Sequence, residues 1–371
     1  MFLTASVDAG NDALKAFIGG LEEENRVYIP NVIKKMDDRP ILSLGDDPLA
    51  ELHLRITSSA INISGTYAVG TLAVKEKDSS HIPATVLKSE SDQTIILTLT
   101  ALAYYAAMHS KAKKVDVEYL LSSGLPVDEV KADKRAAFKE KLIEGTHVIE
   151  FKKTPLLEGK TVNVKFRDAF MNVEGFGAVI NLTVDDKLQA INDELKKKNI
   201  LINDMGGNTT DKAVIRMGRI DNEYSSGSPL GIGEYLDAIK KEVFTTFRVD
   251  VFKSRRQLVE NMTAEKEAFI IRPHGKAESY QTIAEKHLME FAMREYADLV
   301  DKWKEVGDLH SIYNVGGSAA IAKPFLEQIN KENNQFEMHF LDTEESIWSI
   351  AKAYYKLLLI IAKQKGLDLK K

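Results

Sequence analysis

The chain has 371 residues, of which 44% are hydrophobic and 28% are charged, and its formal net charge is −5. A chain of this length has enough apolar material for two or three domains with cores of their own. The mild acidic balance gives no support for a protein that binds nucleic acid or an anionic membrane with its whole surface. The absence of cysteine excludes disulfides, thiolate zinc sites and cysteine nucleophiles.

The sequence shows no signal of export or membrane insertion. The opening stretch MFLTASVDAGND lacks the basic start and the small-residue cleavage site of a signal peptide. The most apolar stretch, around LLLIIA near the C-terminus, is much shorter than the about 20 residues that a transmembrane helix needs. We therefore expect a soluble, cytoplasmic protein without a membrane partner.

Strands and helices alternate along the first half of the sequence. We expect strands where apolar and β-branched residues run between turn residues, and helices where apolar residues recur on a helical period. The elements expected are strands at 2–7, 13–20 and 25–36, a β-rich stretch at about 40–88 that looks like a small inserted subdomain, a buried helix at 91–111, a strand from 114, an amphipathic helix at 127–147 that Gly145 closes, and a strand at 162–173.

The second half of the sequence repeats this organisation. The elements expected are strands at 199–204 and 211–220, a helix after a Gly-rich turn at 227–247, a long charged helix at 281–304, a strand at 310–315, a helix after a Gly turn at 316–329, a strand at 337–341 and a last helix at 344–364. We therefore expect an α/β protein of two halves. Each half opens with two strands joined by a turn that carries Asp and Gly.

The turn between the first two strands has the residue types of an anion site. Gly10 gives the backbone room to aim amide N–H groups at an anion, and Lys15 adds a mobile positive charge. Asn11 and Asp12 complete the turn. Asp8, at the end of an apolar strand, is placed to hold a hydrated cation such as Mg²⁺. Taken alone, this stretch also fits a plain hairpin turn with a surface lysine.

The stretch NDMGGNTTD, residues 203–211, repeats this chemistry after the strand that opens the second half. Its adjacent glycines allow amide groups to face an anion, two threonines add hydroxyl donors, and a carboxylate again ends an apolar strand. A Gly-rich hairpin is the plainer interpretation, but two such loops, one in each half, favour a shared ligand. The residues concerned are Asp204, Gly206, Gly207, Asn208, Thr209, Thr210 and Asp211.

A third glycine turn, with Gly316, Gly317 and Ser318, lies between a strand and a helix. Glycines at such a place allow a flat ligand or a neighbouring helix to come close. Helix–strand packing alone also explains them. The G-x-G-x-x-G spacing of a dinucleotide-binding fold is missing, and the chain contains no G-x-x-x-x-G-K-[ST] phosphate loop.

In this order and spacing, the three loops resemble the nucleotide-binding loops of the superfamily of actin, sugar kinases and heat-shock chaperone ATPases. The resemblance extends over essentially the whole chain. It implies an actin-like (ribonuclease-H-like) α/β fold of two domains with a nucleotide cleft between them. The implied domain I is 1–178, with a β-rich subdomain inserted at about 30–90 and the C-terminal helix at about 343–371; domain II is 179–342, with a helical subdomain at about 225–280.

Finer features resemble the plasmid-segregation bacterial actins of the ParM/StbA type. In that group, as at 124–126 here, Gly-Leu-Pro precedes a charged helix. A strand pair then leads to the Glu-Gly-x-Gly-Ala start of another helix, which in this chain begins at Glu174. The group usually has proline before that glutamate, where this chain has Val173. Actin is a poorer match, because Glu174 stands where actin has glutamine.

The resemblance implies roles for individual residues. Glu174 would position or activate the water that attacks the nucleotide, with Asp211 as the second candidate and Asp204 as a third catalytic residue. Taken alone, Glu174 is also explained as an acid at a helix N-terminus. Asp8 and Asp204 would hold Mg²⁺ through water, and the first two loops would bind the phosphates. The adenosine side would be formed by Gly316, Gly317, Ser318, Lys240 and Lys241.

The activity that the resemblance implies is that of a filament protein. ATP or GTP would bind between the domains and favour head-to-tail association of subunits, and hydrolysis after assembly would destabilise the filament. Plasmid DNA would be moved through a centromere-binding adaptor protein of the ParR kind, without direct contact between the filament and nucleic acid. The alternatives are a small-molecule kinase of the sugar-kinase type, a scaffold without turnover, and a membrane-associated division actin.

Overall fold

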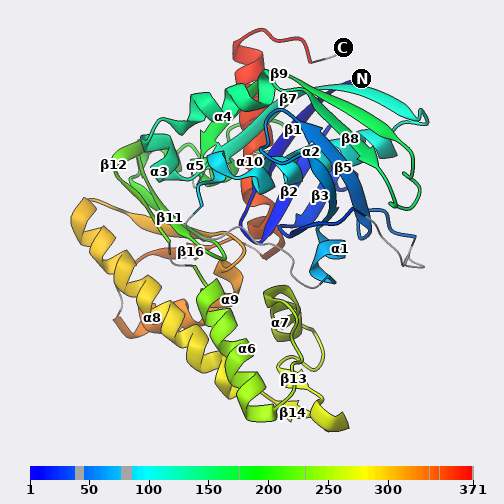
Figure 1. Cartoon of the computed structure of the whole chain (residues 1–371). Coiled ribbons are helices and arrows are strands. Elements are labelled where there is room, and N and C mark those ends of the chain that lie inside the picture. The colour runs from blue at the N-terminus through cyan, green and yellow to red at the C-terminus, as the bar shows by residue number, and fades with distance from the viewer. Residues whose placement is uncertain are drawn as a thin grey trace.

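A computed structural model describes residues 1–37, 46–76, 86–174, 176–229, 231–333, 335–341 and 343–369. The chain forms two α/β halves, each built on a sheet of its own (Figure 1). The organisation into two halves, each opening with an antiparallel strand pair, is therefore confirmed. Parts of the stretch expected as an inserted subdomain, 38–45 and 77–85, lie outside the described residues.

The first half is built on a mixed sheet in the order β3-β2-β1-β7-β9-β8-β5-β6-β4. The central strands β1, β7 and β9 run parallel, and the outer neighbours are antiparallel. β1 is buried along almost all of its length, as expected of a strand covered by helices on both faces, whereas β9 alternates buried residues with more exposed ones. The bounds are β1 (Phe2–Ala9), β2 (Ala13–Ile18), β3 (Arg26–Pro30), β4 (Ile33–Lys35), β5 (Leu52–Ser58), β6 (Gly65–Val69), β7 (Lys114–Leu125), β8 (His147–Phe151) and β9 (Thr161–Val173).

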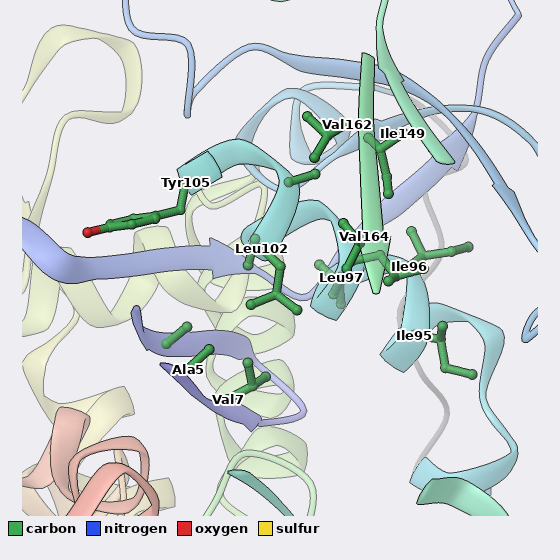
Figure 2. Packing of buried hydrophobic residues seen from close by; sticks show 14 of the residues in the cluster. Ala5, Val7, Ile95, Ile96, Leu97, Leu102, Tyr105, Ile149, Val162 and Val164 are labelled. Atoms are coloured by element: carbon green, nitrogen blue, oxygen red, sulfur yellow. The ribbon is translucent and has the colours of Figure 1, made fainter. Parts of the chain in front are cut away.

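Helix α2 (Asp92–Met108) forms the core on one face of this sheet. The side chain of Ser91 caps it by accepting a hydrogen bond from the backbone N–H of Thr94. The helix is buried almost all round, as its continuous apolar sequence predicts. Figure 2 shows Leu97 and Leu102 among side chains from β1 and β9. Burying each such leucine stabilises the fold by about 1.5–3 kcal/mol.

The second half is built on a smaller sheet in the order β12-β11-β10-β15-β16, with a helical part below it in Figure 1. Its strands are β10 (Ile200–Met205), β11 (Thr210–Arg216), β12 (Arg219–Ser228), β15 (Ser311–Val315) and β16 (Met338–Phe340), with the short pair β13 (Ile270–Ile271) and β14 (Glu278–Ser279). Its helices are α6 (Gly233–Phe247), α7 (Arg255–Met262), α8 (Gln281–Val306) and α9 (Ala319–Asn333).

Two helices join the halves. The last helix, α10 (Thr343–Gln364), returns to the first sheet, where Tyr355 packs with the β2 side chains and Leu358 with those of β7. On another side, Tyr354 of the same helix shares a buried cluster with α5 (Phe176–Thr183) and with strands of the second sheet. The helix pair α5 and α10 therefore forms the floor between the two sheets.

One helix expected from the sequence is wrong. The pattern predicts a single helix over 127–147, whereas the structure has α3 (Val127–Lys131) and α4 (Lys134–Ile143). They are separated at Asp133, whose φ of 55° is left-handed and ends the first helix. The break turns α3 toward the second half, where Nζ of Lys131 donates to the carbonyl of Ser225 in β12 at 2.7 Å.

The inserted strands β5, β6 and β4 continue the first sheet beyond β8, and the short helix α1 (Thr71–Val74) follows them.

In the described ranges, no helix combines the length and the apolarity needed to cross a lipid bilayer.

Candidate functional site

The first loop projects from the end of β1 and returns as β2. The strand pairing sets Asp8 opposite Lys15, and Nζ of Lys15 lies 3.4 Å from Oδ2 of Asp8. Burial opposes the charge of Lys15, but Asp8 and other acids outweigh it and raise its pKa. Asn31 holds the loop from outside by donating from Nδ2 to the backbone carbonyl of Gly10 at 2.8 Å and from its backbone N–H to the backbone carbonyl of Asp12 at 2.9 Å.

The second loop is the matching hairpin of β10 and β11. Its backbone N–H at Gly206 donates to the carbonyl of Thr209 at 2.9 Å, which closes the turn. Asp204 and Asp211 lie opposite each other in the strand pairing. The turn thus separates two carboxylates that the strand pairing brings back side by side.

Helix α6 is attached to this second loop at its first turn. The backbone N–H of Gly233 donates to the carbonyl of Gly207 at 2.6 Å. Arg255 of α7 reaches the same place, where Nη1 donates to Oδ1 of Asn208 at 2.8 Å and Nε and Nη2 bind the carboxylate of Asp237. An arginine from a neighbouring helix therefore orients the second loop.

The third turn is fastened to the second loop as well. Gly316 has a φ of 88°, and a Cβ there would overlap with Oδ1 of Asp204 and lie 2.5 Å from the carbonyl of Met205. This turn therefore requires glycine. Ser318 donates its backbone N–H to Met205 and its hydroxyl to the carbonyl of Gly206, both at 3.1 Å.

The two hairpin loops, far apart in the sequence, meet across the halves. The carboxylate of Asp12 lies against Gly207, where a Cβ would overlap with it. Asp12 also raises the pKa of Lys15 in its own loop and that of Arg255 in the second half, after stronger contributions in each case. The tips of the two loops thus meet at one place between the halves.

Glu174 follows β9 and is buried beside this place. Its Oε1 lies 2.6 Å from Nζ of Lys88, which is buried as well. The backbone of Lys88 is held by Glu129 of α3, whose carboxylate accepts the N–H groups of Lys88 at 2.8 Å and of Ser89 at 2.9 Å. The lysine therefore reaches Glu174 from a firmly held segment.

The carboxylates of the site raise one another's proton affinity. Burial, opposed by Lys88, raises the pKa of Glu174 to about 7. Burial and then Asp8 raise the pKa of Asp204 to about 7. Burial and then Asp204 raise the pKa of Asp211 to about 7. Carboxyl groups whose pKa values are raised to near neutral pH, gathered at one place between two domains, are typical of a functional site.

The same residues fit a hydrated cation bound with an anion. Oδ1 of Asp211 is buried and has no hydrogen-bond partner among the residues described, while the carboxylate also accepts the backbone N–H of Val127. A cation near Asp8 and Asp204 would relieve their mutual repulsion. In the described part of the chain, no three His, Asp or Glu side chains are grouped as direct metal ligands. The donor set therefore suits a cation held through water, as Mg²⁺ often is.

Other expected site residues lie less directly at this place. The hydroxyl of Thr210 donates to Oε1 of Glu295 at 3.2 Å, on the far side of the strand from Asp211. Lys240 is half-buried and Lys241 exposed on α6, about 10 Å or more along the helix from its start. A Cβ at Gly317 would meet nothing within 4 Å. Asn11 and Thr209 are partly exposed at the loop tips.

The sequence interpretation missed four residues that contact or support the site. No local pattern marks Lys88, Arg255, Asn31 or Tyr354, because each lies outside the glycine loops and reaches the site through tertiary packing. The only hint was positional, since Lys88 comes shortly before the Ser91 cap of a helix that packs on the first sheet.

Comparison with protein families places both halves of the sequence. Residues 6–177 match a family model described as actin like proteins N terminal domain. Residues 199–343 match one described as Alp7A C-terminal domain. No curated protein matches the sequence significantly.

Solved structures of low sequence identity share the fold. A Bacillus thuringiensis ParM hybrid protein with ADP, containing two ParM mutants, has a TM-score of 0.74 at 23% identity; the match covers 98% of this chain and 49% of the hybrid, so this chain spans about half of it. Bacillus thuringiensis ParM with ATP gives 0.73 at 22% identity, covering 98% and 99%. The actin-like protein Alp7A gives 0.80 at 18%, covering 99% and 98%. The predicted actin-like fold is confirmed.

Proposed function

The chain belongs to the family of actin-like proteins, and from this premise we propose that it is a filament protein that binds and hydrolyses ATP or GTP. Subunits would associate head to tail through a heterologous interface, which builds filaments when it does not close into a ring. Hydrolysis within the filament would weaken it. The filament would move plasmid DNA in the cytoplasm through a centromere-binding adaptor protein.

The observation that carries this proposal is the meeting of the two loops. Gly207 and Asp12 are in contact across the halves, and the third turn is fastened to the second loop through Ser318. Converging backbone N–H groups in glycine turns are suited to phosphate oxygens. The ParM structures solved with ATP and with ADP share the fold, which supports the same class of ligand for this chain.

Charge supports a nucleotide bound with a cation. Asp12 acts on two basic groups, Lys15 of the first loop and Arg255 of α7, and Lys15 is placed to meet phosphate oxygens. Asp8 and Asp204 would hold Mg²⁺ through its water shell. When bound, the cation supplies charge compensation for the phosphate oxygens.

Glu174 is our candidate for the base. A carboxylate with a pKa of about 7 is in part ionised and in part protonated at neutral pH, which suits acceptance of a proton from water. Lys88 fixes the direction of the carboxylate by a short charged hydrogen bond. Asp211, whose Oδ1 has no partner among the residues described, is the second candidate for orienting the water.

The proposal is tested with the purified chain, magnesium and either ATP or GTP. Light scattering, pelleting and phosphate release are followed together. We expect polymer with at least one nucleotide, and phosphate release that follows assembly. Absence of polymer with both nucleotides would contradict the filament function, and phosphate transfer that needs an added sugar would favour a small-molecule kinase.

A substitution separates assembly from hydrolysis. Glu174→Ala removes the base, so we expect phosphate release to fall by roughly 10²–10⁴-fold while assembly persists. The matched control is Glu118→Gln, which removes an exposed carboxylate that pairs with Arg167. Hydrolysis at the wild-type rate in Glu174→Ala would remove Glu174 from this role.

A further inference from the structure

The floor of the site contains a buried tyrosine hydroxyl. Tyr354 of α10 is completely buried, and its Oη has no hydrogen-bond partner in the part of the chain that the structure describes. A buried hydroxyl without a partner destabilises a fold. The next residue shows the ordinary arrangement, because Oη of Tyr355 lies 2.6 Å from Oγ1 of Thr4. The Tyr354 hydroxyl therefore points to a ligand that satisfies it.

Two glycines make room for this side chain beside Glu174. A Cβ at Gly124, near the end of β7, would overlap with the Tyr354 hydroxyl. A Cβ at Gly177, in α5, would lie 3.3 Å from the ring. The residue after Gly124 is Leu125, whose carbonyl accepts the backbone N–H of Glu174 at 2.9 Å. The hydroxyl thus ends where the chain segment that carries Glu174 is fixed.

Four acids of the site lie close enough to the Tyr354 hydroxyl to act on its pKa. Burial, followed by Glu174, Asp8, Asp204 and Asp211 in that order, raises the pKa of Tyr354 well above its ordinary value. The hydroxyl therefore keeps its proton and is a donor to the site. An ionised carboxylate only accepts hydrogen bonds. A water among these acids therefore donates both of its hydrogen bonds to carboxylates and can turn from one carboxylate to another.

We propose that Tyr354 is a positioning residue for hydrolysis, and that its hydroxyl donates a hydrogen bond to the attacking water beside Glu174. This inference rests on the proposed function. The bond from tyrosine uses one lone pair of the water and leaves the other for the phosphorus. The water oxygen then bonds to the terminal phosphorus as the bond from that phosphorus to the bridging oxygen breaks, and the electron pair of the broken bond leaves with the nucleoside diphosphate. One water proton passes to Glu174, the other stays on the phosphate that forms, and the tyrosine keeps its own proton.

The test is Tyr354→Phe, which removes the hydroxyl and keeps the ring. We expect the rate of phosphate release at saturating nucleotide to fall by about tenfold or more, the rate equivalent of one net hydrogen bond. The dissociation constant of a fluorescent nucleotide analogue and the critical concentration for assembly should stay within about twofold. A loss confined to the rate is not expected from a residue that only supports packing.

The matched control is Tyr355→Phe, which also removes a buried tyrosine hydroxyl from α10. We expect it to lower thermal stability, because it breaks the bond to Thr4, and to keep the wild-type rate. Equal rate losses in both variants, or no loss in Tyr354→Phe, would overturn the role of Tyr354 alone. A wild-type chain that binds nucleotide without releasing phosphate would overturn the hydrolytic function and this inference together.

Discussion

The two halves bring similar loops to the site but supply different charges. The first half contributes carboxylates with cations of its own: Nζ of Lys15 lies 3.4 Å from Asp8, and Nζ of Lys88 lies 2.6 Å from Glu174. Both lysines stay charged, because the acids around them raise their pKa despite burial. On this side each of these carboxylates therefore has a lysine partner before any ligand arrives, although burial still raises the pKa of Glu174 to about 7.

The second half contributes two carboxylates, Asp204 and Asp211, that form no ion pair with a lysine or arginine among the described residues. Asp204 and Asp211 lie opposite each other, and their pKa values rise to about 7. The arginine near this loop, Arg255, pairs with Asp237 instead. A bound cation would therefore relieve more uncompensated negative charge in the second half than in the first. We infer that a hydrated cation stabilises mainly the carboxylates of the second half.

Removing a cation from the first half should have the largest effect. Lys88→Met leaves Glu174 buried without its partner, which costs about 3–5 kcal/mol of stability. Because Lys88 lowers the pKa of Glu174, its loss should raise that pKa further. The base is then protonated at neutral pH, and the acid limb of the rate profile moves to higher pH. Urea unfolding and phosphate release at pH 6–9 measure both effects.

The matched control for this change is an exposed pair. Nζ of Lys134 lies 2.9 Å from Oε1 of Glu90, and the two side chains are 38% and 54% exposed. Lys134→Met should therefore cost less than about 1 kcal/mol and leave the pH profile where it is. A Lys88→Met variant that behaves like Lys134→Met would show that the first half is not balanced by its lysines.

The features predicted from the sequence are those that local patterns encode. The two hairpins, the alternation of strands and helices and the long helices follow from residue periodicity and turn residues, and they are confirmed. The single strands expected over 25–36 and 211–220 are wrong, because the chain breaks each of them into two strands, at 31–32 and at 217–218. The single helix over 127–147 failed because one left-handed residue, Asp133, interrupts a pattern that is otherwise continuous. The recognition of the actin-like family, made on the glycine loops, is confirmed as well.

The features missed depend on contacts between distant segments. Lys88 and Glu174 are 86 positions apart, and a pair of this kind leaves no periodicity to detect. Thr210 shows a different limit. Neighbouring strand residues point to opposite faces, so its hydroxyl reaches Glu295 while Asp211 faces the site, and its assignment to the phosphates stays a prediction.

Neutralising an acid of the second half should raise the stability of the fold, whereas Lys88→Met should lower it. Asp204 has its pKa raised from 3.8 to about 7 in the folded state. Its contribution to stability is therefore fully present below pH 3.8 and is lost as the pH rises through 7. Without nucleotide and magnesium, Asp204→Asn should be more stable than wild type at pH 8 by about 1–3 kcal/mol, and the two should converge near pH 4.

The comparison variant for that experiment is Asp8→Asn, studied by urea unfolding over the same pH range. It leaves the mostly buried Lys15 without its carboxylate, so it should lower stability at pH 8. If both variants move stability in the same direction, the halves do not differ in charge compensation.

A change at the contact between the two halves should have the smallest effect on stability. In Gly207→Ala, the added Cβ overlaps with the carboxylate of Asp12. Asp12 is exposed and can turn away, so we expect a cost at the low end of over-packing, about 1–2 kcal/mol. The loops then lose their contact, and the nucleotide dissociation constant should rise about tenfold. The control is Gly317→Ala, in which the added Cβ has no atom within 4 Å. This variant should leave thermal stability unchanged. Wild-type affinity in Gly207→Ala would mean that the halves bind the nucleotide without this contact, and the difference in their charges would then be the only feature that distinguishes their roles.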